Sequence, residues 1–359
     1  MPPTDARLAL IHDWISGGLG LHPQRIEPAS SDASFRRYFR VFTQRGRAGS
    51  TGAVNASGST FIVMDAPPGK EDVRPYLKVS QLLESIGVHV PHVHEQDVER
   101  GLLLLEDLGT TQYLSRLNAG DDPQLLYGDA LSTLADIQVK GRDAAAELAP
   151  YDREALLREM ALMPEWFCAR HLGLRLSAGE EAVVAAAFEL LIREALAQPK
   201  VFVHRDYHSR NLMVLGERNP GVIDFQDALC GPIGYDLVSL LKDCYISWPR
   251  ERVERWVQGY RASLLKRGGP GGKDDREFLR WFDMIGVQRH IKVLGIFARL
   301  WYRDGKAGYL RDLPLTLEYV RDTCARYEEL SDLSRIVEDQ FVVALPRANA
   351  RVAEQAALA

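Results

Sequence analysis

A short polar stretch, HRDYHSRNL, spans residues 204–212 and holds an aspartate, Asp206, and an asparagine, Asn211, five residues apart. The apolar runs VFVH and NLMVL flank it, a pattern typical of a loop between two strands. Thirteen residues after Asn211, Asp224 stands near the end of a third apolar run, GVIDF. We therefore expect all three polar side chains to project from strand ends, where loop residues commonly carry function.

The types of these side chains indicate magnesium-assisted chemistry. A carboxylate can orient a hydroxyl group and accept its proton, whereas an amide oxygen and a second carboxylate can bind one metal ion. Such oxygen ligands suit Mg²⁺ held jointly by protein and phosphate groups better than they suit zinc. A base, an asparagine and a second aspartate in this order make up the catalytic half of a phosphoryl-transfer site.

The chain before this loop is rich in strand signals. The runs RIEPASSDASFRRYFRVF, TFIVMD and GLLLLED predict four strands, and residues 72–86 carry apolar side chains at helical spacing. The segment RGRAGSTGAVNASGST between the second and third strands is rich in Gly, Ser and Ala, and we assign it no function. This part of the sequence predicts a small sheet with one main helix.

The rest of the chain is predicted to be mainly helical. Asp122 before Pro123 indicates one helix start, and Ser177 with Glu180 indicates another through a capping box. The other expected helices cover residues 152–172, 236–248, 250–267, 274–303 and 314–330. The tail from Arg347 is either a frayed helix or a contact for a partner, and the sequence leaves both possibilities open.

Composition sets broad limits on structure and partners. The 359 residues, 46% of them hydrophobic, suit a globular chain with two lobes, which we place at residues 1–108 (β-rich) and 109–359 (mainly helical), an α+β fold. A net charge of −5 without a basic run argues against nucleic acid as a partner. No leader and no stretch of roughly 18 apolar residues stand out, so we expect no membrane partner and a cytoplasmic location. The four cysteines form no CxxC pair, which argues against zinc and disulfides. The oligomeric state is not indicated.

Five stretches resemble a known family. They are SDASFRRYFRV, MDAPP, LLLEDLG, HRDYHSRNLM and QRHIKVLGIFARL, and they sample the chain from residue 31 to about residue 300. The motif from His204 to Asn211 resembles HRDxxxxN of protein kinases, while His208, IDF and GPIGYDL resemble aminoglycoside phosphotransferases more closely. The chain is most similar to bacterial anomeric kinases for N-acetylmuramate and N-acetylglucosamine. The resemblance implies a two-lobed kinase-like fold, ATP and Mg²⁺ as cofactors, and sugar 1-phosphate formation in peptidoglycan recycling.

The resemblance also implies roles for individual residues. Asp206 would orient the sugar hydroxyl and accept its proton, and Asn211 and Asp224 would hold magnesium. Asp236 would brace the loop from the following helix, or else serve only as the N-cap of that helix. We expect His204 to pack within the structure rather than to react.

The nucleotide side departs from the kinase pattern. Backbone groups of Glu106 and Leu108 in EDLG would meet the adenine, and the turn SSDASF has no glycine, so Ser31 or Ser34 would contact phosphate. Where a kinase has its third-strand lysine, this strand reads FIVMDAPP, without a lysine. The candidates to replace that lysine are Arg37 and Lys70, unless both are ordinary surface charges.

The acceptor is expected to meet the helix at 274–303. This helix is largely apolar, with a stripe of polar side chains that either binds the acceptor or forms a solvated face. The stripe comprises Gln288, Lys292, Arg299 and Arg303, with Arg289 and His290 alongside. We expect acceptor contacts from Arg289 and Lys292 and from His208, Gln226 and Asp227. Such basic residues would repel a cationic aminoglycoside and could pair a carboxylate-bearing sugar.

Three alternatives stay open. The acceptor could be an aminoglycoside, choline or homoserine. A protein kinase is disfavoured because DFQ stands in place of DFG and no APE-like segment follows. A nucleotide-binding pseudokinase that serves as an interaction module is favoured by the missing lysine and disfavoured by the presence of Asp206, Asn211 and Asp224.

Overall fold

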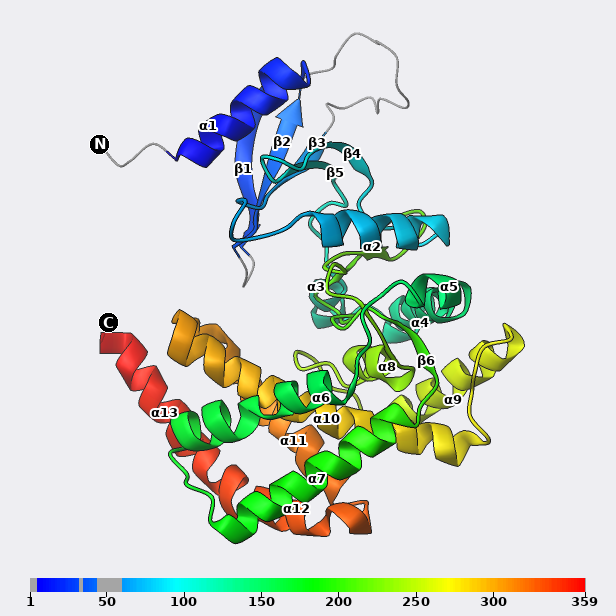
Figure 1. The fold of residues 1–359 in the computed structure, drawn as a ribbon, viewed down its shortest axis with the longest axis vertical. Helices are drawn as coiled ribbons and strands as arrows, with labels where there is room; N and C mark the ends of the chain where they lie inside the picture. Colours follow the sequence, from blue (N-terminus) through cyan, green and yellow to red (C-terminus); the bar gives the residue numbers. More distant parts are fainter. Residues whose placement is uncertain (1–4, 32–34, 44–59, 359) are drawn as a thin grey trace. The chain divides into compact units, whose positions relative to one another are not determined.

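The computed structural model describes residues 5–31, 35–43 and 60–358 (Figure 1). The chain forms two compact units. The first comprises residues 1–111 and 213–227, and the second comprises residues 112–212 and 228–359. The chain therefore leaves the second unit after Leu212 and returns to it at Ala228, so Asp224 belongs to the first unit and the loop at 204–211 to the second.

The first unit is built on one antiparallel sheet, as Figure 1 shows. Its order is β1 (Pro23–Ser31), β2 (Arg37–Thr43), β3 (Thr60–Asp65), β5 (Leu102–Glu106) and β4 (Val93–Asp97). The four predicted strands are present. Strand β4 was not predicted, because its sequence VHEQD is polar and mostly exposed and gives no alternating signal.

The first unit also holds two helices, of which α1 packs on the sheet. Helix α2 (Arg74–Ser85) matches the expected helix, whereas α1 (Ala6–Asp13) precedes the first strand and was not predicted. The prediction of a single main helix was therefore wrong. Ile11, Trp14 and Ile15 from α1 and the segment after it join the sheet residues Val41 and Val63 in one apolar cluster. Within α1 only Ile11 is fully buried, so its own sequence carries too weak a pattern to reveal it.

Asp65 ties this helix to the sheet. Its side chain is completely buried. It accepts hydrogen bonds from the guanidinium of Arg37 on the neighbouring strand (2.6 and 3.1 Å) and from Nε of Arg7 on α1 (2.9 Å). Because it pairs with the buried Asp65, Arg37 is half-buried in a structural ion pair and is not a simple surface charge. Side chains alternate along a strand, so Met64 points to the face of the sheet opposite to Asp65.

The second unit is mainly helical, and the predicted α+β class is confirmed. Its longer helices are α4 (Pro123–Lys140), α6 (Arg153–Met160), α7 (Ala178–Leu196), α8 (Gly234–Leu241), α9 (Arg250–Lys266), α10 (Asp275–Asp304), α11 (Leu313–Cys324) and α13 (Val343–Leu358). Helix α10 packs against α7, α8, α9, α11 and the π-helical segment η2 (Met163–Leu172), so it is enclosed on all sides. Asp122 and Ser177 with Glu180 cap α4 and α7 as expected.

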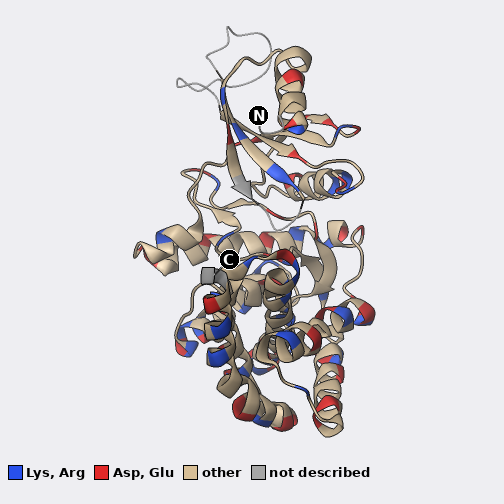
Figure 2. Cartoon of the chain, turned by 90° about the vertical axis from the view of Figure 1, so that its left-hand side faces the viewer, with Lys and Arg blue, Asp and Glu red and all other residues tan. Residues whose placement is uncertain are grey.

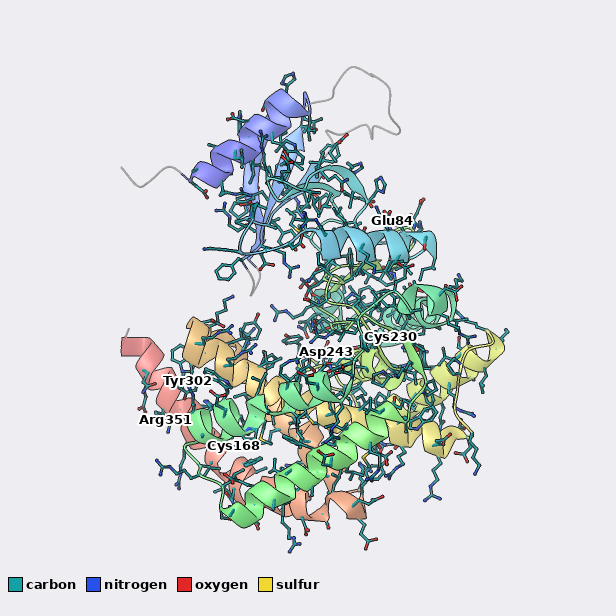
Figure 3. The ribbon with its side chains drawn as sticks, in the orientation of Figure 1. Glu84, Cys168, Cys230, Asp243, Tyr302 and Arg351 are labelled. Carbon is teal, nitrogen blue, oxygen red and sulfur yellow. The ribbon has the colours of Figure 1, made fainter. Side chains whose placement is uncertain are left out.

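Two helix ends differ from the prediction. Helix α8 ends at Leu241 rather than at residue 248, and α11 ends at Cys324 rather than at residue 330. The tail is a packed helix: in α13, Ala348 and Val352 are buried and Arg351 donates a hydrogen bond to the His171 carbonyl (Figure 3).

Short strands frame the polar loop. Strands β6 (Lys200–Val203) and β9 (Leu229–Pro232) pair with each other, as do β7 (Leu212–Met213) and β8 (Gly221–Val222). Acidic and basic residues are interspersed along the helices, as Figure 2 shows. Within the described residues, no helix is long and apolar enough to cross a membrane.

We predict that Asp65→Ala lowers the local stability of the sheet by about 2 kcal/mol, the scale of a hydrogen bond to a charged group. The change leaves the guanidinium groups of Arg7 and Arg37 without their buried acceptor. Hydrogen exchange of β2 and β3 amides measures this loss. The control is Glu27→Ala on β1, which removes an exposed pair with Arg25 and should cost about 0.5 kcal/mol or less. Equal losses in both variants would contradict the structural role of Asp65.

Candidate active site

The loop at residues 204–211 is held at its start by Asp236. The buried carboxylate of Asp236 accepts hydrogen bonds from the backbone N–H groups of His204 (2.7 Å) and Arg205 (2.9 Å). Helix α8 begins two residues earlier, at Gly234, so Asp236 lies inside its first turn and is not its N-cap. The His204 side chain is fully buried, and its Nδ1 accepts from the N–H of Asp206 (3.3 Å), which makes it part of the loop support.

A second aspartate, Asp243, supports the middle of the same loop (Figure 3). Its buried carboxylate accepts from the N–H and the hydroxyl of Ser209 and from the N–H of Tyr245. The sequence analysis missed Asp243. Asp243 lies two residues beyond the end of α8, so helical spacing from Asp236 could not have revealed it.

Two non-glycine residues beside the predicted site adopt left-handed backbone conformations. Arg205, which precedes Asp206, has φ 79°, and Asp224 has φ 66°. Such conformations cost on the order of 1–3 kcal/mol and persist where the surroundings hold them in place, commonly at functional sites. Of the three such residues described, the third being Arg218, two therefore lie on the segments that the motif analysis singled out.

Asp206 lines a small cavity of about 80 Å³ in the second unit. His208, Tyr235, Arg289 and Lys292 line the same cavity. Side chains such as Val293, Ile296 and Phe297 from α10 form its apolar wall. The structure thus brings the predicted base together with three of the five predicted acceptor-binding residues.

The surroundings of Asp206 keep its carboxylate ionised. Burial acts to raise its pKa, but the positive charges of Lys292 and Arg205 outweigh burial and hold the pKa below the ordinary value of 3.8. Burial lowers the pKa of His208, so this imidazole is neutral near pH 7. An ionised carboxylate beside a neutral imidazole can accept a proton from a hydroxyl group.

Lys292 is positioned by a partly buried acid, Glu159, that the sequence analysis missed. Its Nζ lies 3.3 Å from Glu159 Oε1 and donates to the Tyr235 hydroxyl at 2.9 Å. Glu159, on α6, also pairs with Arg205 and accepts from the Tyr151 hydroxyl. It lies far from the loop in sequence, so no local pattern could have revealed it.

The interpretation of the α10 polar residues as a solvated face was wrong for most of them. Gln288, Arg289, His290 and Lys292 are at most 6% exposed, whereas Arg303 is largely exposed. The reason is the central position of α10, because neighbouring helices cover the side that a lone amphipathic helix would present to water.

The predicted metal ligands present oxygen atoms. The side-chain NH₂ of Asn211 donates to the Asp206 carbonyl (3.0 Å), which turns the amide oxygen of Asn211 away from that carbonyl. In the first unit, Asp224 Oδ1 accepts from Gln226 Nε2 at 2.9 Å. Across the described residues there is no cluster of three or more His, Cys, Asp or Glu side chains suited to a metal. The available donors therefore fit an ion such as Mg²⁺, which takes few protein ligands and completes its shell with phosphate and water.

Gln226 and Asp227 lie beside Asp224 in the first unit. The amide of Gln226 donates to both carboxylates, while its own oxygen is buried without a hydrogen-bond partner among the described residues. Their expected contact with the acceptor stays a prediction.

The EDLG segment is fixed within the first unit. The guanidinium of Arg40 makes two hydrogen bonds to Asp107, at 2.7 and 3.0 Å, and Asp107 also accepts from the N–H of Gly109. The N–H of Glu106 donates to the His92 carbonyl, so this group is already used. Contacts of Glu106 and Leu108 with adenine remain predicted.

The phosphate side of the first unit is only partly described. Ser31 ends β1, and Ser34 lies outside the described residues. Arg37 is engaged by Asp65, and Lys70 lies over the ring of Phe35 (4.8 Å). Neither contact identifies a substitute for the third-strand lysine.

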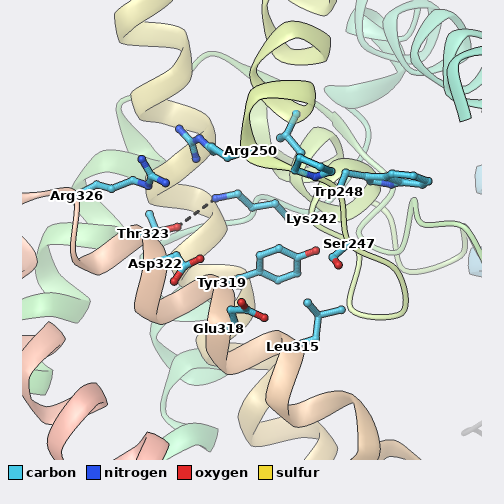
Figure 4. Close-up of a pocket in the computed structure, with 12 residues that line it drawn as sticks. Lys242, Ser247, Trp248, Arg250, Leu315, Glu318, Tyr319, Asp322, Thr323 and Arg326 are labelled. Carbon is cyan, nitrogen blue, oxygen red and sulfur yellow. Dashed lines mark hydrogen bonds between the residues drawn. The ribbon is translucent and has the colours of Figure 1, made fainter.

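A larger pocket, of about 400 Å³, lies between α9 and α11 (Figure 4). None of its twelve lining residues is a predicted site residue. Its cations Lys242 and Arg250 both pair with the buried Asp283, at 3.1 and 2.6 Å. Arg250 also pairs with Glu254 at 2.6 Å, so these two cations are balanced by two carboxylates of the protein, which distinguishes this pocket from the cavity at Asp206.

Comparison with known proteins identifies the fold. Solved structures with similar folds include a choline kinase from Streptococcus pneumoniae (TM-score 0.60, 14% identity, 89% of this chain and 99% of that one). An ADP-bound aminoglycoside phosphotransferase has a TM-score of 0.55 at 14% identity and covers 88% of this chain and 98% of that one. At such identities the likeness shows the fold alone, and it is a kinase-like phosphotransferase fold.

Sequence comparison is more specific. Residues 25–282 match the phosphotransferase enzyme family. N-acetylmuramate/N-acetylglucosamine kinases from Pseudomonas putida and Pseudomonas aeruginosa are 43% and 44% identical, over 94% and 93% of this chain and 98% and 96% of their own. The kinase of that name from Caulobacter vibrioides is 30% identical, over 88% of this chain and 91% of its own. The chain therefore belongs to the phosphotransferase enzyme family, within its group of N-acetylmuramate/N-acetylglucosamine kinases, and is an ATP-dependent phosphotransferase.

We predict that Asp243→Ala lowers the free energy of unfolding of the second unit by about 3 kcal/mol, because it leaves buried donors of Ser209 and Tyr245 unpaired. Urea unfolding followed by tryptophan fluorescence measures this, since five of the six tryptophans lie in the second unit. Asp121→Ala is the control, because it breaks only an exposed pair with Arg116 and should cost at most about 1 kcal/mol. A similarly small loss for Asp243→Ala would show that this aspartate does not support the loop.

Proposed function

We propose that this chain transfers the γ-phosphoryl group of ATP to the anomeric C1 hydroxyl of N-acetylmuramate and N-acetylglucosamine. The product is a sugar 1-phosphate. Because N-acetylmuramate is a building block of bacterial peptidoglycan, the reaction would serve recovery of cell-wall sugars. The use of ATP is consistent with a cytoplasmic location. The names and identities of the Pseudomonas kinases support the substrate class.

The observation that carries the proposal is the cavity in which Asp206 lies beside His208, Arg289, Lys292 and apolar side chains. Such a cavity can admit a sugar hydroxyl and orient it for attack. Nδ1 of His208 is buried and has no hydrogen-bond partner among the described residues, so it is suited to bind a second hydroxyl of the acceptor.

Asn211 and Asp224 are the proposed magnesium ligands. When bound, the ion would neutralise charge that develops on the phosphoryl group during transfer. Asn211 is oriented by its own loop and Asp224 by Gln226 and by its strained backbone. Glu106 and Leu108 are proposed to meet the adenine, and Ser31 and Ser34 the phosphates.

A cationic acceptor such as choline or an aminoglycoside is less suitable. Arg289 and Lys292 line the cavity beside Asp206, and both are almost fully buried. A second cation brought into this enclosed space would be repelled, because electrostatic interactions are strong where water is excluded.

The first test is phosphorus NMR of the purified protein with Mg-ATP and, separately, N-acetylmuramate, N-acetylglucosamine, kanamycin and choline. We expect a sugar 1-phosphate signal with the two N-acetyl sugars. Asp206→Asn keeps the shape and removes the base, so kcat should fall at least about 100-fold.

Asp121→Asn, an acid-to-amide change away from the cavity, should turn over at the wild-type rate. Near wild-type turnover of Asp206→Asn would refute the role of Asp206. ATP binding without product from either sugar would instead favour another acceptor or the interaction module.

The pH dependence of kcat/KM tests the electrostatic role of Lys292. In the wild type, the pKa of Asp206 is held below its ordinary value. The fall of kcat/KM on the acidic side of the pH profile, its acidic limb, should therefore lie below about pH 4. Lys292→Met removes a positive charge that favours the ionised carboxylate, so the pKa of Asp206 rises and the limb moves to higher pH. The exposed Lys273→Met serves as control. A limb that stays in place in Lys292→Met would show that Lys292 does not tune Asp206.

A further inference from the structure

The two cations beside Asp206 differ in their partners. Lys292 is paired with Glu159 and with the Tyr235 hydroxyl. Arg289 has no carboxylate within ion-pair distance anywhere in the described part of the chain, and it donates a hydrogen bond to Cys244 Sγ, 3.6 Å from Nη1. Lys292 therefore belongs to an internal network, whereas Arg289 does not.

The contact with Cys244 does not neutralise Arg289. Burial raises the pKa of this thiol, so the sulfur is a neutral and weak acceptor. Arg289 is only 4% exposed, and its Nε meets no acceptor among the described residues. A buried guanidinium with unused donors is costly unless an anion completes it, and the guanidinium shape matches a carboxylate. Because Arg289 lines the cavity of Asp206, the partner that completes it would be part of the acceptor.

We propose that Arg289 binds the lactyl carboxylate of N-acetylmuramate and thereby sets the preference between the two sugars. The inference rests on the proposed function and deepens it. The two acceptors share the anomeric hydroxyl, the acetamido group and the ring. They differ at C3, where N-acetylmuramate carries the lactyl ether and N-acetylglucosamine a hydroxyl. Asp206 and Arg289 line one cavity, so the reacting hydroxyl and the carboxylate are the two groups of the acceptor that would be directed at it.

The test compares kcat/KM for both sugars in the wild type, Arg289→Met and Arg289→Lys. We expect Arg289→Met to lower the ratio of N-acetylmuramate to N-acetylglucosamine by about 10- to 100-fold, the range for a lost charged hydrogen-bond pair, mainly through KM. Arg289→Lys should restore part of the ratio, because it keeps the charge and loses the fork of donors. Arg276→Met, an exposed position on the same helix, is the matched control and should leave the ratio unchanged.

A second measurement needs no variant. Wild-type enzyme is assayed with N-acetylmuramate and with its methyl ester, which keeps the lactyl group and removes its charge. The ester should lose most of the selectivity over N-acetylglucosamine. Equal use of acid and ester overturns the inference, as does an equal fall for both sugars in Arg289→Met, which would assign Arg289 to the phosphoryl group. If the wild type phosphorylates neither sugar, the proposed function itself fails, and the inference fails with it.

Discussion

Asp206 is a largely enclosed carboxylate that has to remain ionised, and much of the second unit is arranged around that requirement. Removing a carboxylate from water favours its protonated form, and a protonated group could not accept a proton from a hydroxyl. Positive charge from Lys292 and Arg205 offsets this effect. Both cations are tied to Glu159, which fixes their positions and limits the excess charge.

The position of α10 makes this arrangement possible. A helix on the surface would carry Lys292 into solvent, where its field on Asp206 would be screened. Because α6, α8 and the segment η2 cover α10, its polar residues are forced inward, where they need partners. Glu159 is the partner of Lys292. For Arg289, which lines the cavity, the proposed partner is the acceptor. A buried guanidinium without a carboxylate partner would destabilise most helix interfaces, and here the same group is proposed to recognise the acceptor.

Local signals predicted the features that depend on local sequence. The capped helices α4 and α7, the long α10, the strands β1, β2, β3 and β5, and the motif at 204–211 were all indicated by spacing and cap residues. Features that depend on distant contacts were missed or misread. Helix α1 is stabilised by the sheet it covers, and Glu159 and Asp243 act through residues 46 and 34 positions away in sequence. Periodicity located the polar residues of α10 but could not reveal which side of that helix faces solvent.

The contrast between two neighbouring aspartates supports the assignment of the base. Asp236 and Asp206 are both enclosed, but burial raises the pKa of Asp236 to about 7 and the negative charge of Asp206 adds to that shift, while cations hold the pKa of Asp206 low. Asp236 accepts two backbone N–H groups and serves the loop, a role that depends on hydrogen bonding rather than on exchange of a proton with an acceptor. Environments that separate the pKa values of neighbouring acids identify which acid does the chemistry. On this argument Asp206 is the group that receives the proton, and Asp236 is the group that holds the loop of Asp206 in position.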